Sequence, residues 1–112
     1  MTDPPYSSSR RAGNVLLTAG ILGRSGEDLA EGFEAQLGLA IDNLLALLEP
    51  EGLGERDVVR LVVYLTDIGD MGVLNRVFSE RFSEPRPTRS TVAVSALPVG
   101  ALVEIEATAS AA

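Results

Sequence analysis

Four polar side chains near the end of the sequence have types and spacing suited to acid–base chemistry. Glu104 and Glu106 are two residues apart in an alternating segment, so in a strand they share one face, and Arg89 and Thr91 alternate likewise in the preceding segment. If the two segments pair as a hairpin with their apolar residues together, all four side chains lie on one sheet face, away from the helices. An arginine beside carboxylates is either a structural salt bridge or a functional site.

The composition restricts the chemistry further. The 112 residues include no His, Cys or Trp, and all nine basic residues are Arg, so there is no Lys. These absences exclude a Ser-His-Asp triad, a thiolate nucleophile, a cysteine-based metal site, a Schiff-base lysine and a Walker-type phosphate loop. Chemistry here must use Arg, acidic residues, Tyr, hydroxyl and amide side chains, and backbone amides.

The net charge indicates which kinds of binding partner are unfavourable. Sixteen acidic residues against nine basic ones give a net charge of −7. A field of that sign opposes binding to nucleic acid, because phosphate binding depends on clustered positive charge. No run approaches the roughly 20 apolar residues of a membrane span, and the N-terminus has no basic segment followed by an apolar one. We therefore expect a cytoplasmic protein that binds neither membrane nor nucleic acid.

Two segments have the periodicity of helices. Apolar residues recur at three- and four-residue intervals within residues 29–48, where Pro50 and Gly52 follow, and again within residues 71–82, where Pro85 and Pro87 follow. The first stripe comprises Phe33, Leu37, Ala40, Ile41, Leu44 and Leu48; the second comprises Met71, Leu74, Phe78 and Phe82. We predict that these stripes pack against a sheet.

Strands are predicted around the helices, giving an α+β fold in a single domain, residues 1–112, with residues 1–5 as a loose tail. The predicted strands are residues 6–11, 15–22, 57–66, 89–94 and 102–109. Two helices cover only one face of such a sheet, yet the second and third strands are apolar on both faces. The uncovered face is therefore expected to meet another subunit. The alternative is an ordinary, somewhat apolar surface.

Several segments of the sequence, in the right order, resemble the RidA (YjgF) family. The most specific is the run from Arg86 to Val94 followed by Ala96 to Ala107, which is similar to the family's C-terminal signature. Three further segments resemble family elements: Gly13 to Gly20, Asp57 to Asp67, and Leu74 to Phe78. The resemblance spans nearly the whole chain.

The resemblance implies a chorismate-mutase-like fold, with a mixed sheet and two helices on one face, assembled as a homotrimer with clefts between subunits. It implies hydrolysis of reactive 2-imino or 2-enamino acids to 2-keto acids and ammonia, without metal or organic cofactor. By this resemblance Arg89 holds the substrate carboxylate, its planar fork being suited to bidentate binding. Glu104 matches the acidic residue that orients water and handles its proton.

Other positions carried over from the family have more ordinary interpretations beside them. Tyr6 matches a tyrosine at the cleft, and the alternative is an ordinary packed or exposed side chain. Asn75 matches an asparagine near the site but suits any helix surface. Gly20 would let a backbone amide approach a ligand, although a strand bulge explains it as well. Ala19 and Thr91 complete the predicted substrate-binding set.

Departures from the family pattern bear on the substrate. Thr91 stands where Cys is common, Ala19 where Ser is usual, and Ile21 where the family has Gln. Together with Pro4 in place of Gly, and a shorter turn at residues 23–27, these changes predict a more apolar cleft. One alternative is therefore a pathway-specific enzyme acting on a larger enamine or imine. Others are a non-catalytic module that binds a small carboxylate or a partner protein, and a ribonuclease, which the net charge opposes.

Overall fold

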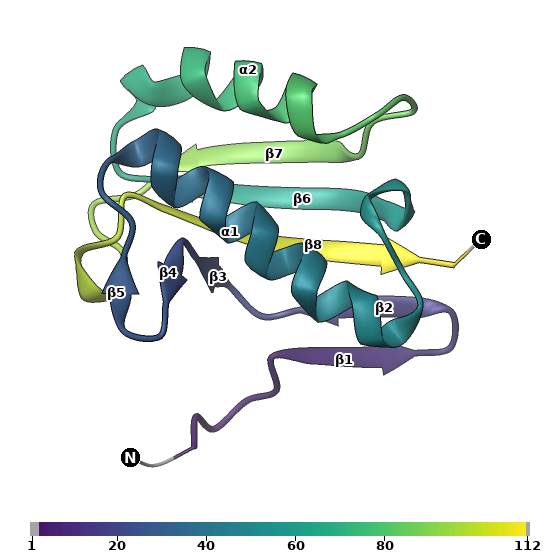
Figure 1. The fold of residues 1–112 in the computed structure, drawn as a ribbon. Helices are drawn as coiled ribbons and strands as arrows, with labels where there is room; N and C mark the ends of the chain where they lie inside the picture. The colour runs from purple at the N-terminus through teal and green to yellow at the C-terminus, as the bar shows by residue number, and fades with distance from the viewer. Residues whose placement is uncertain (1–2, 112) are drawn as a thin grey trace.

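The computed structural model describes residues 3–111, which form a mixed sheet, a two-stranded ribbon and two helices (Figure 1). The helices are α1 (Phe33–Leu48) and α2 (Met71–Arg81). The strands are β1 (Ser9–Ala12), β2 (Val15–Thr18), β3 (Ile21–Leu22), β4 (Arg24–Ser25), β5 (Asp28–Leu29), β6 (Val58–Leu65), β7 (Thr88–Ala93) and β8 (Val103–Ser110). This arrangement confirms the predicted α+β class. Residues 1 and 2 of the predicted tail lie outside the described residues.

The order of strands in the main sheet corrects one prediction. The order is β1-β2-β8-β6-β7, with β3 also paired to β8, so β6 separates the two strands expected to form a hairpin. Strands β6 and β7 are parallel, whereas β8 is antiparallel to its partners. A parallel pair needs a crossover connection, and α2 provides it between β6 and β7. The strand–helix–strand order in the sequence was the signal for this arrangement.

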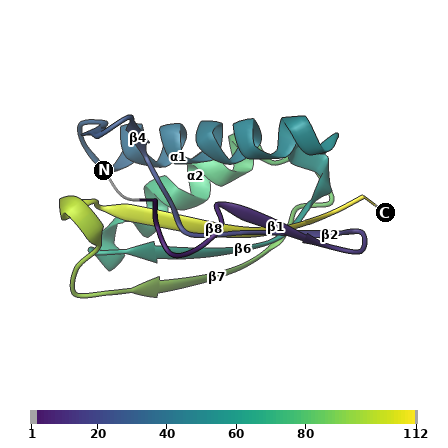
Figure 2. The ribbon, with the colours of Figure 1, turned by 90° about the horizontal axis from the view of Figure 1, so that it is seen from below.

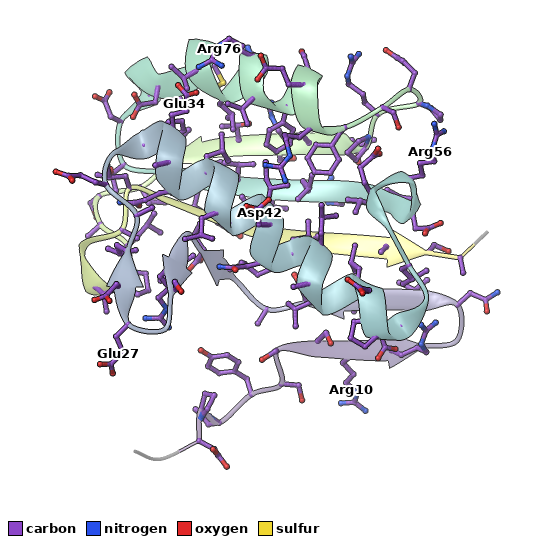
Figure 3. The ribbon with its side chains drawn as sticks, viewed as in Figure 1. Arg10, Glu27, Glu34, Asp42, Arg56 and Arg76 are labelled. Carbon is purple, nitrogen blue, oxygen red and sulfur yellow. The ribbon has the colours of Figure 1, made fainter. Side chains whose placement is uncertain are left out.

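Both helices lie on the same side of the sheet, as predicted (Figure 2). The six predicted core positions of α1 are all buried, and so are Leu74, Phe78 and Phe82. Ion pairs join the helices across their solvent side, from Arg76 to Glu34 (2.5 Å) and from Arg81 to Asp42 (2.6 Å), and Figure 3 labels three of these residues. The helices therefore form one layer, and the opposite sheet face is left open within the chain.

Several predicted boundaries are shifted by local backbone geometry. The strand expected over residues 15–22 is interrupted at Ala19 and Gly20, so it forms β2 and β3 instead. Helix α1 begins at Phe33 rather than Leu29 because Leu29 pairs in the β4–β5 ribbon and Gly32 adopts a φ of 90° before the helix. The first strand covers residues 9–12 rather than 6–11.

A bulge at the start of β6 interrupts the alternation of side chains between the two faces of the sheet. Val58 pairs with Ala109 and Arg60 with Thr108, so Val59 is the extra residue. Val58 consequently joins Leu61 in the core, while Val59, which strict alternation would place on the same face as Leu61, is 47% exposed. Alternation along the sequence cannot reveal such a break, because one inserted residue shifts every earlier side chain to the other face.

A buried glutamine fixes the start of β8 against α1. Gln36 is 4% exposed; its Nε2 donates to the carbonyl oxygen of Ala30 at 3.0 Å, and its Oε1 accepts from the amide of Leu102 at 2.8 Å. The backbone of α1 passes so close to Gly23 that a Cβ there would lie 1.9 Å from the Gln36 carbonyl oxygen. This contact requires glycine and holds the β3–β4 connection on the helix.

The open face of the sheet mixes apolar and charged side chains. Leu17 and Val92 are 48% and 44% exposed, and Arg60 lies between their strands and hydrogen-bonds Ser90 at 3.3 Å. This mixture leaves the expected subunit contact a prediction. Within residues 3–111, neither helix combines the length and apolar character needed to cross a bilayer.

Candidate functional site

Arg89 lies on the helix-covered face of the sheet, beneath α2. In register it pairs with Leu61 of β6, which is completely buried, and Leu61 also pairs with Ala107 of β8. Paired residues point to the same side of a sheet, so the Arg89 side chain lies on the face opposite Glu104 and Glu106. The predicted grouping of arginine and carboxylates on one open face is therefore wrong within a single chain. It failed because it assumed a β7–β8 hairpin.

Neutral groups hold the guanidinium of Arg89 in place. Its Nε donates to Thr91 Oγ1 at 2.8 Å, and its Nη2 donates to Asn75 Oδ1 at 2.6 Å and approaches the Met71 sulfur at 3.6 Å. The guanidinium carbon lies 4.9 Å from the centroid of the Phe78 ring, a cation–π arrangement. Thr91 and Asn75, both predicted as site residues, thus contact Arg89 directly. The other two neighbours of its guanidinium, Met71 and Phe78, lie on α2.

The charge of Arg89 is fixed in position but not neutralised within the described chain. None of the ion pairs among residues 3–111 involves it. Partial burial lowers the pKa of Arg89, because the charged form loses hydration. A half-buried arginine surrounded by neutral acceptors is suited to binding an external carboxylate, since an incoming anion restores the missing countercharge.

Glu104 lies on the open face, in contact with the segment of Ala19 and Gly20 that separates β2 from β3 (the β2–β3 break). It pairs in register with Tyr64 of β6 on one side and with Leu22 of β3 on the other. A Cβ on Gly20 would lie 2.7 Å from the Glu104 carboxyl carbon, so the glycine provides the space that the carboxyl occupies. Burial raises the pKa of Glu104, and the nearby charge of Glu106 raises it further.

A cavity of about 470 Å³ lies between the N-terminal segment, β3 and α1. Three predicted site residues line it, namely Tyr6, Ala19 and Gly20. Its wall includes Ile21 and Leu47, but Arg24 and Asn43 add polar groups that the sequence did not indicate, and the lining is more polar than apolar, contrary to the predicted apolar character. Gly20 connects this cavity to Glu104, since it lines the one and contacts the other.

The seven predicted site residues thus form two groups. Arg89, Thr91 and Asn75 lie beneath α2; Glu104, Gly20, Ala19 and Tyr6 lie around the β2–β3 break. The sequence reasoning missed Tyr64, whose hydroxyl donates a short hydrogen bond to Glu106. A tyrosine on a predicted strand was the available signal, but its partner depends on the β6–β8 register, which local sequence does not give.

Comparison with known proteins identifies the family. Residues 2–111 match the family described as Endoribonuclease L-PSP. The chain belongs to this family, also called RidA or YjgF. A RutC family protein of Pyrococcus horikoshii is 40% identical over 108 residues, covering 94% of this chain and 86% of that protein. A 2-iminobutanoate/2-iminopropanoate deaminase of Dermatophagoides farinae is 34% identical over 105 residues, covering 91% and 82%.

A solved RidA structure confirms the fold. RidA from an Antarctic Psychrobacter species superposes with a TM-score of 0.92 at 41% identity, covering 98% of this chain and 91% of that one. The RidA family includes proteins named as imine deaminases, which supports this activity at the level of the family.

Proposed function

We propose that the protein hydrolyses reactive 2-imino or 2-enamino acids to 2-keto acids and ammonia, in clefts between the subunits of a homotrimer. The observation that carries this proposal is the un-neutralised Arg89, held by Thr91 and Asn75 in an orientation that leaves its charge for an external carboxylate. Bidentate binding of the α-carboxylate fixes the adjacent C=N carbon in position.

The reaction balances without a further reactant. Water adds to the imine carbon, its oxygen forming the new C–O bond, while one proton passes to the nitrogen and yields a carbinolamine. Collapse of the carbinolamine transfers its hydroxyl proton to the nitrogen and forms the C=O bond as the C–N bond breaks, which releases ammonia and leaves the 2-keto acid. Glu104 relays the proton from the attacking water to the nitrogen, a role suited to a carboxyl whose pKa is raised toward neutrality by burial. We expect no metal or cofactor to take part.

The placement of the two groups supports a site shared between chains. Arg89 and Glu104 lie on opposite faces of one sheet, so a ligand of a few atoms bound to one cannot contact the other in the same chain. A second copy resolves this separation if its Glu104 group approaches the Arg89 group of the first. Closed ring symmetry then gives one such cleft per chain, and three clefts in a trimer.

A second candidate within the same chemistry is a pathway-specific enzyme that acts on a larger enamine or imine. The cavity of about 470 Å³ favours it, since that volume exceeds what a two- or three-carbon side chain needs, and Ile21 and Leu47 provide apolar walls. A series of imines with lengthening side chains separates the two candidates. Rising kcat/KM with length supports the pathway enzyme, and a maximum at the smallest imines supports the general deaminase.

Two measurements test the proposal. Imines generated in situ from amino acids should release 2-keto acid and ammonia faster with the protein than without it. A crystal soaked with 2-ketobutanoate should place the ligand carboxylate on Arg89. No acceleration for any imine of the series, despite binding of the keto acid, would instead support a non-catalytic carboxylate-binding module.

A further inference from the structure

Glu104 and Glu106 project side by side from the open face of β8, two residues apart. Two carboxylates at this spacing repel each other, so their proton affinities are coupled. Whichever of them receives the better hydrogen-bond donor holds the negative charge more easily, and the other then retains a proton to higher pH. The surroundings of the pair therefore decide which carboxyl can donate a proton near neutral pH.

Of the two carboxylates, Glu106 is the one that receives a hydrogen-bond donor, the hydroxyl group of Tyr64. The register places Tyr64 directly opposite Glu104 and Val62 opposite Glu106, yet the Tyr64 hydroxyl reaches diagonally and donates to Glu106 Oε1. This hydrogen bond, together with burial, raises the pKa of Tyr64, so the phenol remains a donor throughout the working range. A charge-assisted bond of this kind stabilises the ionised form of Glu106.

Glu104 has no comparable donor among the described residues. No side chain of residues 3–111 donates to its carboxyl group in the hydrogen bonds of the structure, and Gly20 presents only backbone to it. The charged groups that share its face are Glu106 on β8, Arg60 on β6, which hydrogen-bonds Ser90, and Arg10, which projects from edge strand β1 (Figure 3). Neither arginine forms an ion pair with Glu104.

We propose that Tyr64 and Glu106 are positioning residues for the proton transfer at Glu104: the phenol keeps the negative charge on Glu106, and Glu104 is thereby the carboxyl that exchanges a proton with the substrate nitrogen. Neither residue needs to touch the substrate. This inference rests on the proposed deamination, because it says which residues control the proton-transfer step of that reaction. A purely structural cross-strand pair would stabilise the sheet but would leave the titration of Glu104 unchanged.

The test compares Tyr64→Phe and Glu106→Gln with Thr108→Val, which removes a hydroxyl from the same face of β8 without touching the pair. Carbon-13 NMR of labelled glutamate side chains follows both carboxyls during a pH titration, and imine hydrolysis is measured over the same range. In the unmodified protein Glu104 should titrate above the usual range of a glutamate. Glu106→Gln should lower the pH at which Glu104 titrates, because the neighbouring negative charge is gone.

Tyr64→Phe should lower the pH at which Glu104 titrates, because the negative charge beside it on Glu106 loses its hydrogen-bond donor, and kcat should fall near neutral pH with KM unchanged. Thr108→Val should move neither titration. The inference is overturned if Tyr64→Phe and Glu106→Gln both leave the titration of Glu104 unchanged, or if imine hydrolysis by Tyr64→Phe has the pH dependence of the unmodified protein. Failure of the proposed function looks different: the unmodified protein would then not accelerate imine hydrolysis at any pH, whatever the titrations show.

Discussion

Arg89 and Glu104 occupy opposite kinds of surroundings. Arg89 lies under α2, with its guanidinium held by Thr91 and Asn75 and stacked near the Phe78 ring. Glu104 lies on the open face, and Gly20 leaves space around its carboxyl. The first arrangement restrains a permanent charge in one orientation, whereas the second leaves a titratable group able to gain and lose a proton.

In the proposed reaction, this difference assigns carboxylate binding to one face of the sheet and proton transfer to the other. Binding a carboxylate benefits from a rigid, pre-oriented fork, because little conformational entropy is then lost on binding. Proton transfer requires a carboxyl whose pKa is raised and which is not tied to a strong donor. Because Arg89 and Glu104 lie on opposite faces of one chain's sheet, the proposed site takes one of the two residues from a second chain.

The largest effect is expected from Glu104→Gln, which keeps the shape of the side chain but cannot transfer a proton. We expect kcat for imine hydrolysis to fall by about 10²- to 10⁴-fold, the range typical of general acid–base catalysis. Binding of a 2-keto acid, measured by calorimetry, should be nearly unchanged because it depends on the arginine. An equal loss of binding and turnover would contradict the assignment of binding and proton transfer to different faces.

A smaller effect, on binding, is expected from Arg89→Lys. The charge is retained but the fork is lost, and a hydrogen bond to a charged group contributes about 1.5–3 kcal/mol, so kcat/KM should fall about 10- to 150-fold. Arg86→Lys, at an exposed position beside Glu84, is the control and should have normal kinetics. If Arg89→Lys instead unfolds the protein while activity per folded site survives, Arg89 is structural.

Gly20→Ala is expected to displace the Glu104 carboxyl without affecting the residues around Arg89. The new Cβ would lie 2.7 Å from the Glu104 carboxyl carbon, so the flexible end of that side chain must move. We expect kcat to fall on the order of tenfold from misplacement of the carboxyl, with little loss of stability. Gly38→Ala, in α1 with nothing within 4 Å of the new Cβ, should leave kcat unchanged. Normal turnover in Gly20→Ala would mean that Glu104 does not require its observed position.

The smallest effect concerns the dependence of stability on pH. The folded-state pKa of Glu104 is raised, so ionisation of this group destabilises the native state. Below the ordinary pKa of a glutamate, about 4.3, both states are protonated and there is no penalty; the penalty grows as pH rises through the folded-state pKa. Glu104→Gln should therefore raise the unfolding midpoint in urea at pH 7 but not at pH 3.5. A gain at both pH values would point to a cause other than ionisation.

The sequence predicted the helices better than the pairing of strands. Leu37, Ala40 and Leu44 follow the helical period, and burial of that stripe is a local property of the sequence. Strand pairing is not local, because the parallel β6–β7 pair and the antiparallel β6–β8 pair both form between segments far apart in the chain. The expected hairpin therefore failed, and with it the expected side of Arg89.

For the candidate site, the sequence predicted which residues take part better than how they are placed relative to one another. The family resemblance selected Thr91 and Asn75, and both contact Arg89. It did not predict that Tyr64 binds Glu106, because this contact depends on a diagonal across the β6–β8 register. The bulge at Val59 is a further example, since a single unpaired residue changes which side chains share a face.

The central claim, that one site uses Arg89 of one chain and Glu104 of another, is tested by mixing two defective variants. Arg89→Lys and Glu104→Gln chains, each nearly inactive alone, are co-expressed in equal amounts with different tags and purified as mixed oligomers. If each cleft takes its arginine and its glutamate from neighbouring chains, every mixed trimer has one of its three clefts with both residues intact, so about a third of the unmodified activity should return. If the mixed oligomers show only the average of the two parent variants, both residues serve the same chain and the shared site is wrong.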